Sequence, residues 1–317
     1  MQRTAVVVGV ANKRSLAWSC ARSLLQGNFD HVIVTYQCGR FQPSIERMVQ
    51  SQNDMYAKEF VSNGIQGTIV PRNNGSQRPK LISSFPCDVS HQQDVQSLFE
   101  EKIPSLLLDQ SRQDSTGDDV TPGINALVHS VAYAPMDAMK PERGSDSESF
   151  PLLHTTSEAF DIAHSVSSYS LLELSRYALP LLTTAEGGVN ASQSMMSSSS
   201  ITALSYLGSI RATPNYNIMG PAKASLEAMV RGLALELSPP PHSIRVNAVS
   251  AGPVNTLAAR GIKDFTALKS EAEGRSMIRR GVTSEEVGNV VAFLAGEGAS
   301  GVTGQVWFCD GGYCAHG

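Results

Sequence analysis

Two residues in the second half of the chain have the types and the spacing that hydride chemistry uses. Tyr216 and Lys223 are seven positions apart in a segment that the sequence predicts to be helical. At 3.6 residues per turn they lie on one helix face, about 10 Å apart along the axis. A phenol can hydrogen-bond an oxygen that gains negative charge, and an ammonium can anchor a ribose and stabilise the anion. The pair therefore indicates a reductase site beside a nicotinamide.

The spacing of this pair also indicates where the negative charge develops. The chain contains no Tyr-x3-Lys. In the reduction of a ketone the hydride reaches the carbonyl carbon, so the phenol must lie close to the nicotinamide. When hydride adds to the β-carbon of a conjugated thioester, the charge appears on an oxygen further away. A Tyr two helical turns from the Lys fits the second geometry.

The elements that must position these residues alternate along the chain between strand-like and helical patterns. Seven strands are predicted, at 4–9, 31–36, a run ending at 87, 124–130, 199–205, 243–249 and 305–309. The first is apolar without alternation, as buried parallel strands are. Helices are predicted at 15–27, 43–62, after a capping box at Ser90–Gln93, at 158–182, from Thr213–Pro214 to 237, and at 284–295. The order predicts one α/β domain over 1–317, a doubly wound Rossmann fold with a seven-stranded parallel sheet and helices on both faces.

Three polar stretches interrupt this alternation, at about 63–80, 109–122 and 187–198. They are rich in Ser, Asn, Gln, Gly and Asp, a composition that cannot build a core. We expect them to be surface insertions with no assigned role.

The first predicted strand runs into a turn and a helix start that suit a dinucleotide. Gly9 can make the tight turn there, and Ser15 can offer a hydroxyl to phosphate or simply cap the helix. After the second strand, neutral Gln37 stands where an acid would select NAD, with Arg40 nearby. NADH is therefore favoured over NADPH, which stays an alternative. Asp88 follows the third strand; because Ser90 and Gln93 are expected to cap the next helix, its carboxylate is left to accept from an adenine amino group.

Composition and charge exclude several classes of protein. The 317 residues are 41% hydrophobic with a net charge of −4, which excludes a disordered chain. Lys and Arg (25) are fewer than Asp and Glu (29), so a nucleic-acid partner is not expected. The longest apolar run near the start, Ala5–Ala11, is too short to cross a membrane, and strand-like sequence from Thr4 leaves no room for a leader. The seven histidines show no metal-binding spacing, and the five cysteines include no C-x-x-C, which indicates a reducing compartment.

Seven ordered motifs give the chain a resemblance to the enoyl-acyl-carrier-protein reductases, a divergent branch of the short-chain dehydrogenase/reductases. They are Gly9–Ala17, Thr35–Gln37, Cys87–Val89, Val128–Ala134, the segment with Tyr206, Tyr216 and Lys223, Arg245–Pro253, and Val302–Gly304 with Asp310–Gly312. The resemblance covers nearly the whole chain apart from the three insertions. It implies the NADH-dependent reduction of a trans-2-enoyl thioester in type II fatty-acid biosynthesis.

The resemblance also implies roles for individual residues. The cofactor would contact Gly9, Ser15, Leu16, Gln37, Asp88, Val89, Ser130, Val131, Lys223, Val254 and Thr256. The substrate would contact Ala132, Tyr133, Tyr206, Met219, Ile262 and Phe265. Among the catalytic residues Tyr216 would hold the enolate oxygen, Lys223 the nicotinamide ribose, and Tyr206 would line the acyl pocket. Either Tyr216 or water would deliver the final proton.

The segment at about 254–281 lies where this family keeps its substrate lid. Residues 260–280 hold six basic and three acidic residues, a local excess that suits an acidic acyl-carrier protein, although a solvated mixed-charge helix explains the charges equally well. The expected carrier contacts are Arg260, Lys263 and Lys269. Thr266 and Ala267 replace the basic pair usual in the family, which weakens this expectation. By the same resemblance a homotetramer is expected.

Two other interpretations compete with that of an enoyl-thioester reductase. One is a ketoacyl or ketone reductase of the same fold, against which the missing Tyr-x3-Lys argues. The other is a nicotinamide-binding sensor without turnover, which would need neither Tyr216 nor Lys223. The expected compartment is the cytoplasm, or the plastid stroma if a transit peptide has been removed.

Overall fold

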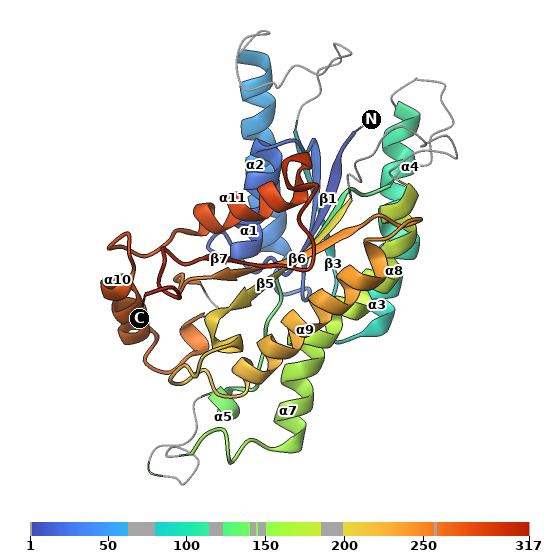
Figure 1. Cartoon of the computed structure of the whole chain (residues 1–317). Coiled ribbons are helices and arrows are strands. Elements are labelled where there is room, and N and C mark those ends of the chain that lie inside the picture. Colours follow the sequence, from blue (N-terminus) through green and yellow to red (C-terminus); the bar gives the residue numbers. More distant parts are fainter. Residues whose placement is uncertain are drawn as a thin grey trace.

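The centre of the protein is one seven-stranded parallel sheet with the strand order β3-β2-β1-β4-β5-β6-β7 (Figure 1). The computed structural model describes residues 2–62, 80–113, 123–139, 144, 150–184, 199–256 and 259–316. The strands are β1 (Thr4–Val8), β2 (His31–Tyr36), β3 (Leu81–Pro86), β4 (Ala126–His129), β5 (Ser200–Tyr206), β6 (Arg245–Ala251) and β7 (Val306–Cys309).

Helices cover both faces of this sheet (Figure 1). On one face the core includes side chains of α1 (Leu16–Gln26), α2 (Gln42–Ser62) and α11 (Ser284–Ala295). On the other it includes α4 (Ile103–Gln113), α8 (Ser170–Thr184) and α9 (Met219–Leu237). Shorter elements are α3 (Gln92–Ser97), α5 (Met136–Met139), α7 (Ser157–His164), α10 (Phe265–Arg275), the π-helical turns η1 (Leu98–Lys102) and η2 (Ser165–Tyr169), and the 3-10 turns η3 (Leu207–Ser209), η4 (Ala259–Gly261) and η5 (Glu297–Ala299).

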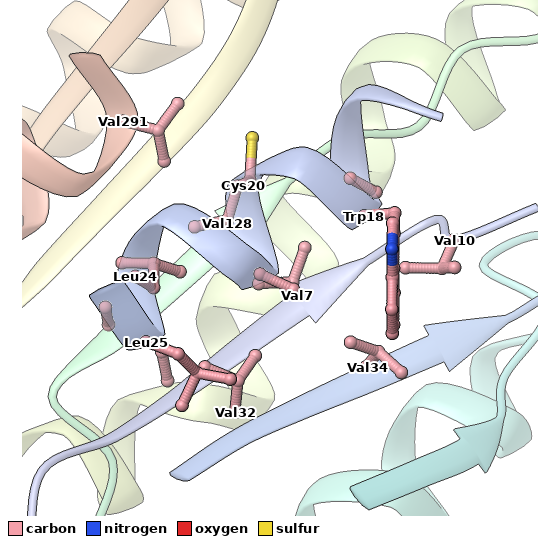
Figure 2. Close-up of a cluster of buried hydrophobic side chains, with 14 of the residues drawn as sticks. Val7, Val10, Trp18, Cys20, Leu24, Leu25, Val32, Val34, Val128 and Val291 are labelled. Carbon is pink, nitrogen blue, oxygen red and sulfur yellow. The ribbon is translucent and has the colours of Figure 1, made fainter. Parts of the chain in front are cut away.

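Strand β1 is apolar without alternation because each of its faces meets a helix layer. In β1, Ala5 and Val7 point into the cluster under α1 and α11, while Val6 and Val8 point into the cluster under α8 and α9. Figure 2 shows the first cluster, with Trp18 of α1 beside Val10 and above Val34. The predicted doubly wound α/β fold is therefore confirmed.

Several local predictions differ from the structure. The helix predicted at 158–182 is α7 and α8 joined by the π-turn η2. The helix predicted from Thr213–Pro214 starts at Met219 instead, because Asn215 and Asn217 take left-handed φ values of 61° and 36°. Of the three predicted insertions, residues 109–113 belong to α4 and Lys80 directly precedes β3; the remainder lies outside the described residues. Within the described ranges, no helix has both the length and the apolar character that crossing a bilayer requires.

Candidate active site

The turn after β1 has a conformation that requires glycine. Gly9 has a φ of +103°, which L side chains rarely adopt. A Cβ there would lie 2.4 Å from the Ser130 carbonyl oxygen and 3.0 Å from the Val131 side chain. Since β1 and β4 are neighbours, the structure brings together three of the predicted cofactor contacts at the carboxyl ends of two adjacent strands.

Helix α1 begins shortly after this turn, and Ser15 is its N-cap. The Ser15 hydroxyl accepts from the Trp18 N–H at 3.4 Å and donates to the Asn12 carbonyl at 2.7 Å. Leu16 is the first helical residue. The free N–H groups and the positive end of the helix dipole lie here, where dinucleotide folds place a pyrophosphate. Ser15 therefore has the capping role, and its contact with phosphate stays a prediction.

Gln37 and Asp88, both predicted to meet the adenosine, bind each other. Gln37 Nε2 donates to Asp88 Oδ2 at 3.1 Å. The predicted capping box is wrong: Ser90 donates its N–H and its hydroxyl to Asp88 Oδ1, at 3.0 and 2.6 Å, and the N-cap of α3 is His91, which makes no side-chain cap. Partial burial raises the pKa of Asp88, but the bonds from Ser90 and Gln37 outweigh it and leave this pKa below its ordinary value. The Asp88 carboxylate thus already accepts hydrogen bonds from three donors. The expectation that it is unused because Ser90 and Gln93 cap the helix is wrong.

The other predicted cofactor contacts lie at the same edge of the sheet. Val89 is buried in the core, so its backbone rather than its side chain is available to a ligand. Val254 and Thr256 follow β6, and the Thr256 N–H donates to the Val254 carbonyl at 2.8 Å. The Thr256 hydroxyl accepts from the Ala259 N–H at 3.1 Å. Open α/β sheets bind their ligands at this carboxyl edge.

A cavity of about 490 Å³, here called the basic cavity, opens beside the β1–α1 loop. Its lining comes from that loop, from α2 and from the segment after β6: Asn12, Lys13, Arg14, Ser44, Arg47, Met48 and Arg260. Four of these residues are cations and none is an acid, so the cavity attracts anions. The grouping is not visible in the sequence because the fold alone joins the three segments. In the sequence, the basic cavity is indicated locally by the adjacent pair Lys13–Arg14.

Tyr216 precedes α9 rather than lying in its first turn. Its ring packs against the ring of Tyr206, with centroids 4.7 Å apart and the planes tilted by 55°. It also packs on Gly208, where a Cβ would lie 2.3 Å from Tyr216 Cδ1. Burial raises the pKa of both phenols above the ordinary value, so at neutral pH each is a hydrogen-bond donor.

Lys223 reaches the same place from α9. Its side chain is buried, and Nζ donates to the Leu204 carbonyl of β5 at 2.8 Å. Burial lowers the pKa of Lys223 to about 8, and the nearby charge of Glu227 opposes this effect. The spacing predicts that Tyr216 and Lys223 share a helix face, but Tyr216 lies before α9 and Lys223 within it. Both side chains instead converge on the end of β5, where Tyr206 also lies.

Part of the predicted acyl pocket forms one apolar cluster around Tyr216. Tyr206, Met219 and Ile262 all pack in it. Its other members, which carry no local sequence signal, are Ala134, Ala138, Met139, Ala159, Ala163 and Ile218. Elements α5 and α7 therefore contribute to the walls of this cluster.

Three predicted substrate contacts lie outside this cluster. Ala132 and Tyr133 are exposed, and Phe265 is half-buried at the start of α10. The backbone of Tyr133 is held by Ser167 Oγ, which accepts from its N–H and donates to its carbonyl, both at 2.9 Å.

The predicted lid, 254–281, holds η4 and α10 among its described residues. The three expected carrier contacts differ in their surroundings. Arg260 lines the basic cavity, Lys263 precedes α10, and Lys269 forms an ion pair with Glu273 one turn further along α10. This ion pair reduces the positive charge that Lys269 presents to a partner.

Comparison with known proteins places this geometry in a family. A family model described as Enoyl-(Acyl carrier protein) reductase matches residues 114–314. The NADH-dependent enoyl-[acyl-carrier-protein] reductase FabI of Enterococcus faecalis is 36% identical over 310 residues, which cover 98% of this chain and 96% of that protein. The FabI of Bacillus subtilis is 34% identical over 311 residues, 98% and 95% of the two chains.

Solved structures agree with the sequence comparisons. The enoyl-[acyl-carrier-protein] reductase of Aquifex aeolicus matches with a TM-score of 0.72 at 30% identity, covering 99% of this chain and 97% of that one. The Bacillus cereus enzyme, crystallised with NADP+ and indole naphthyridinone, matches with a TM-score of 0.70 at 33% identity over the full length of both chains. The chain belongs to the enoyl-acyl-carrier-protein reductase family.

Proposed function

We propose that the protein is an NADH-dependent enoyl-[acyl-carrier-protein] reductase that converts a trans-2-enoyl thioester to the saturated acyl thioester in type II fatty-acid biosynthesis. The observation that carries the proposal is the convergence of Tyr206, Tyr216 and buried Lys223 at the end of β5. The family of the chain supports the same activity.

The residues at the carboxyl edge of the sheet fit a dinucleotide. Gly9 leaves a space that a Cβ would fill, and the N-terminus of α1 supplies N–H donors beside it. When bound, NADH supplies a hydride to the β-carbon of the enoyl chain. We assign the nicotinamide ribose to Lys223 and the adenosine ribose to Gln37, whose neutral amide favours NADH. Because the Bacillus cereus relative was crystallised with NADP+, both nucleotides belong in the test.

The side chains near Tyr216 have distinct tasks in this reaction. The Tyr216 phenol, kept protonated by burial, donates a hydrogen bond to the oxygen that becomes the enolate. The Lys223 cation stabilises the same developing charge from α9. Tyr206, Met219 and Ile262, which pack in one apolar cluster with Tyr216, line the acyl chain and exclude water.

Turnover with matched thioesters tests the proposal against its alternatives. The purified protein is given NADH or NADPH with a trans-2-enoyl thioester and, separately, with a 3-ketoacyl thioester, and nicotinamide oxidation is followed. We expect turnover with the enoyl substrate and a higher kcat/KM with NADH. Turnover with the keto substrate alone would identify a ketoacyl reductase. Cofactor binding without turnover of either thioester would identify a sensor.

We further propose that the acyl-carrier protein docks beside the lid, through Arg260, Lys263 and Lys269. Lys263→Glu is expected to raise KM for the carrier-bound enoyl substrate by about three- to tenfold, since a docking charge is reversed. KM for the same acyl chain on a small thiol should stay unchanged. Lys58→Glu is the matched control, because Lys58 is exposed on α2 about three turns beyond the residues of that helix that line the basic cavity. An equal loss with both substrates would place Lys263 in the acyl pocket instead.

A homotetramer is proposed on the family resemblance and on exposed apolar side chains. Trp307 and Phe308 lie on the edge strand β7, and Phe293 of α11 packs against Trp307 with centroids 5.6 Å apart. Such a patch on an edge strand suits a subunit contact. All five cysteines are free thiols, which supports a reducing compartment such as the cytoplasm.

A further inference from the structure

A buried carboxylate on α9 links the three residues assigned to catalysis. Glu227 lies one helical turn after Lys223 and is 4% exposed. Its Oε1 accepts from the Ser205 hydroxyl at 2.5 Å and from the Ser209 hydroxyl at 2.6 Å. These serines flank Tyr206, one at the end of β5 and the other in η3. A single carboxylate oxygen therefore fastens both sides of the segment 206–208 to α9.

This fastened segment determines where the Tyr216 ring lies. The ring packs on Gly208, and a Cβ on Gly220 of α9 would lie 2.9 Å from the Gly208 carbonyl oxygen. Gly208 thus lies between the phenol and α9 and approaches both closely. Freeing Ser205 and Ser209 from Glu227 would let this segment shift, and the rings of Tyr206 and Tyr216 would shift with it.

The same carboxylate acts on Lys223 through its charge. His129 on β4 also interacts with the charge of Lys223, and the phenols of Tyr206 and Tyr216 lie around the end of β5, the strand to which Lys223 Nζ donates. Burial and the charge of Lys223 lower the pKa of His129 to about 3, so this histidine is neutral; its Nε2 lies 2.8 Å from Ser170 Oγ. Both phenols are neutral as well. Glu227 is therefore the neighbour that opposes the cost of burying the ammonium.

We infer that Glu227 is a positioning residue for the reaction: it fixes the Tyr206–Gly208 segment through Ser205 and Ser209 and keeps Lys223 charged inside the protein. The inference rests on the proposed function. It assigns Glu227 two separable tasks, a tether and a countercharge, and each predicts a different kinetic change.

Three variants separate the two tasks. Glu227→Gln keeps an oxygen acceptor for the serines and removes the charge. Glu227→Asp keeps the charge and shortens the reach, and Ser205→Ala with Ser209→Ala removes the tether alone. Glu236→Gln, on the exposed side of α9, is the matched control. Circular dichroism and Tm confirm that each variant folds.

The readouts are kcat, KM for the enoyl thioester, and kcat/KM as a function of pH. For Glu227→Gln we expect kcat to fall at least about tenfold with KM within about twofold, and the loss of activity at high pH to begin about one pH unit lower. Glu227→Asp should keep the wild-type pH profile at a reduced kcat, as should the double serine variant. A purely structural role would lower Tm without moving the pH profile.

Some outcomes would overturn the inference. One is Glu227→Gln with wild-type kcat and an unshifted pH profile. If Glu227→Gln does not fold, wild-type kinetics of both Glu227→Asp and the double serine variant overturn the inference. The wild-type protein in the same assay tests the proposed function separately. If the wild-type protein turns over neither thioester, the inference is tested by NADH affinity alone, measured as a function of pH in the wild type and in Glu227→Gln. The same pH dependence in both proteins would contradict the inference.

Discussion

Replacing Tyr216 with phenylalanine is expected to lower kcat for the enoyl thioester by about 10²- to 10³-fold, while the affinity for NADH stays unchanged. A single hydrogen-bond donor to a developing oxyanion has an effect of this size. The ring and its packing on Tyr206 and Gly208 remain, so the site keeps its shape. Steady-state kinetics gives kcat and KM, and NADH fluorescence titration gives the cofactor affinity.

Two comparisons sharpen this result. Tyr169→Phe removes a hydroxyl from an exposed tyrosine on η2 and should leave every constant unchanged. Tyr206→Phe, in the same cluster, should change KM for the acyl chain more than kcat. If Tyr216→Phe lost less than about threefold in kcat, the enolate oxygen would have to be held by another group.

Gly9→Ala is expected to weaken NADH binding by more than about tenfold and to lower Tm. The substitution forces an L side chain into a φ of +103°, a strain of about 1–2 kcal/mol. It also drives a Cβ to 2.4 Å from the Ser130 carbonyl oxygen, which is backbone and cannot rotate away. The β1–α1 turn and the end of β4 must therefore separate, and these are the two segments assigned to the cofactor. Fluorescence titration and thermal unfolding measure the two effects.

Gly301→Ala is the matched control, because a Cβ there meets nothing within 4 Å and its φ is not positive. It should bind NADH as the wild type does. A Gly9→Ala protein with wild-type cofactor affinity would show that the dinucleotide does not lie on this turn.

Much of the sheet could be predicted from the sequence because β1, β2 and β4 are mostly apolar runs that are buried on both faces. The limits predicted for β2 agree at both ends with His31–Tyr36. Helix α11 also has its predicted limits, and there the local chemistry is decisive: Thr283 and Glu286 form a capping box. The segments 63–79, 114–122 and 185–198, which contain most of the predicted insertions, lie outside the described residues.

The geometry of the site is harder to predict from the sequence, because tertiary contacts override local sequence signals there. Thr213–Pro214 has the pattern of a helix start, yet the Asn217 amide donates to the Ala138 carbonyl of α5 at 3.0 Å and the chain stays irregular until Met219. Asparagine tolerates the left-handed backbone that this path requires. The bond between Gln37 and Asp88 joins residues 51 positions apart, so no spacing rule reveals it. The individual roles of the site residues stay predictions.

The burial of Lys223 has a consequence for attempts to make this protein more heat-resistant. Burial lowers the pKa of the ammonium from 10.5 to about 8, which corresponds to about 3 kcal/mol against folding at neutral pH. This cost is complete below pH 8 and fades as the pH rises toward 10.5. Apolar residues of similar volume at Lys223 and Glu227 would escape it. A screen that selected for melting temperature alone would therefore favour variants without the Lys223 ammonium. The selected variants would lose catalytic activity before other properties.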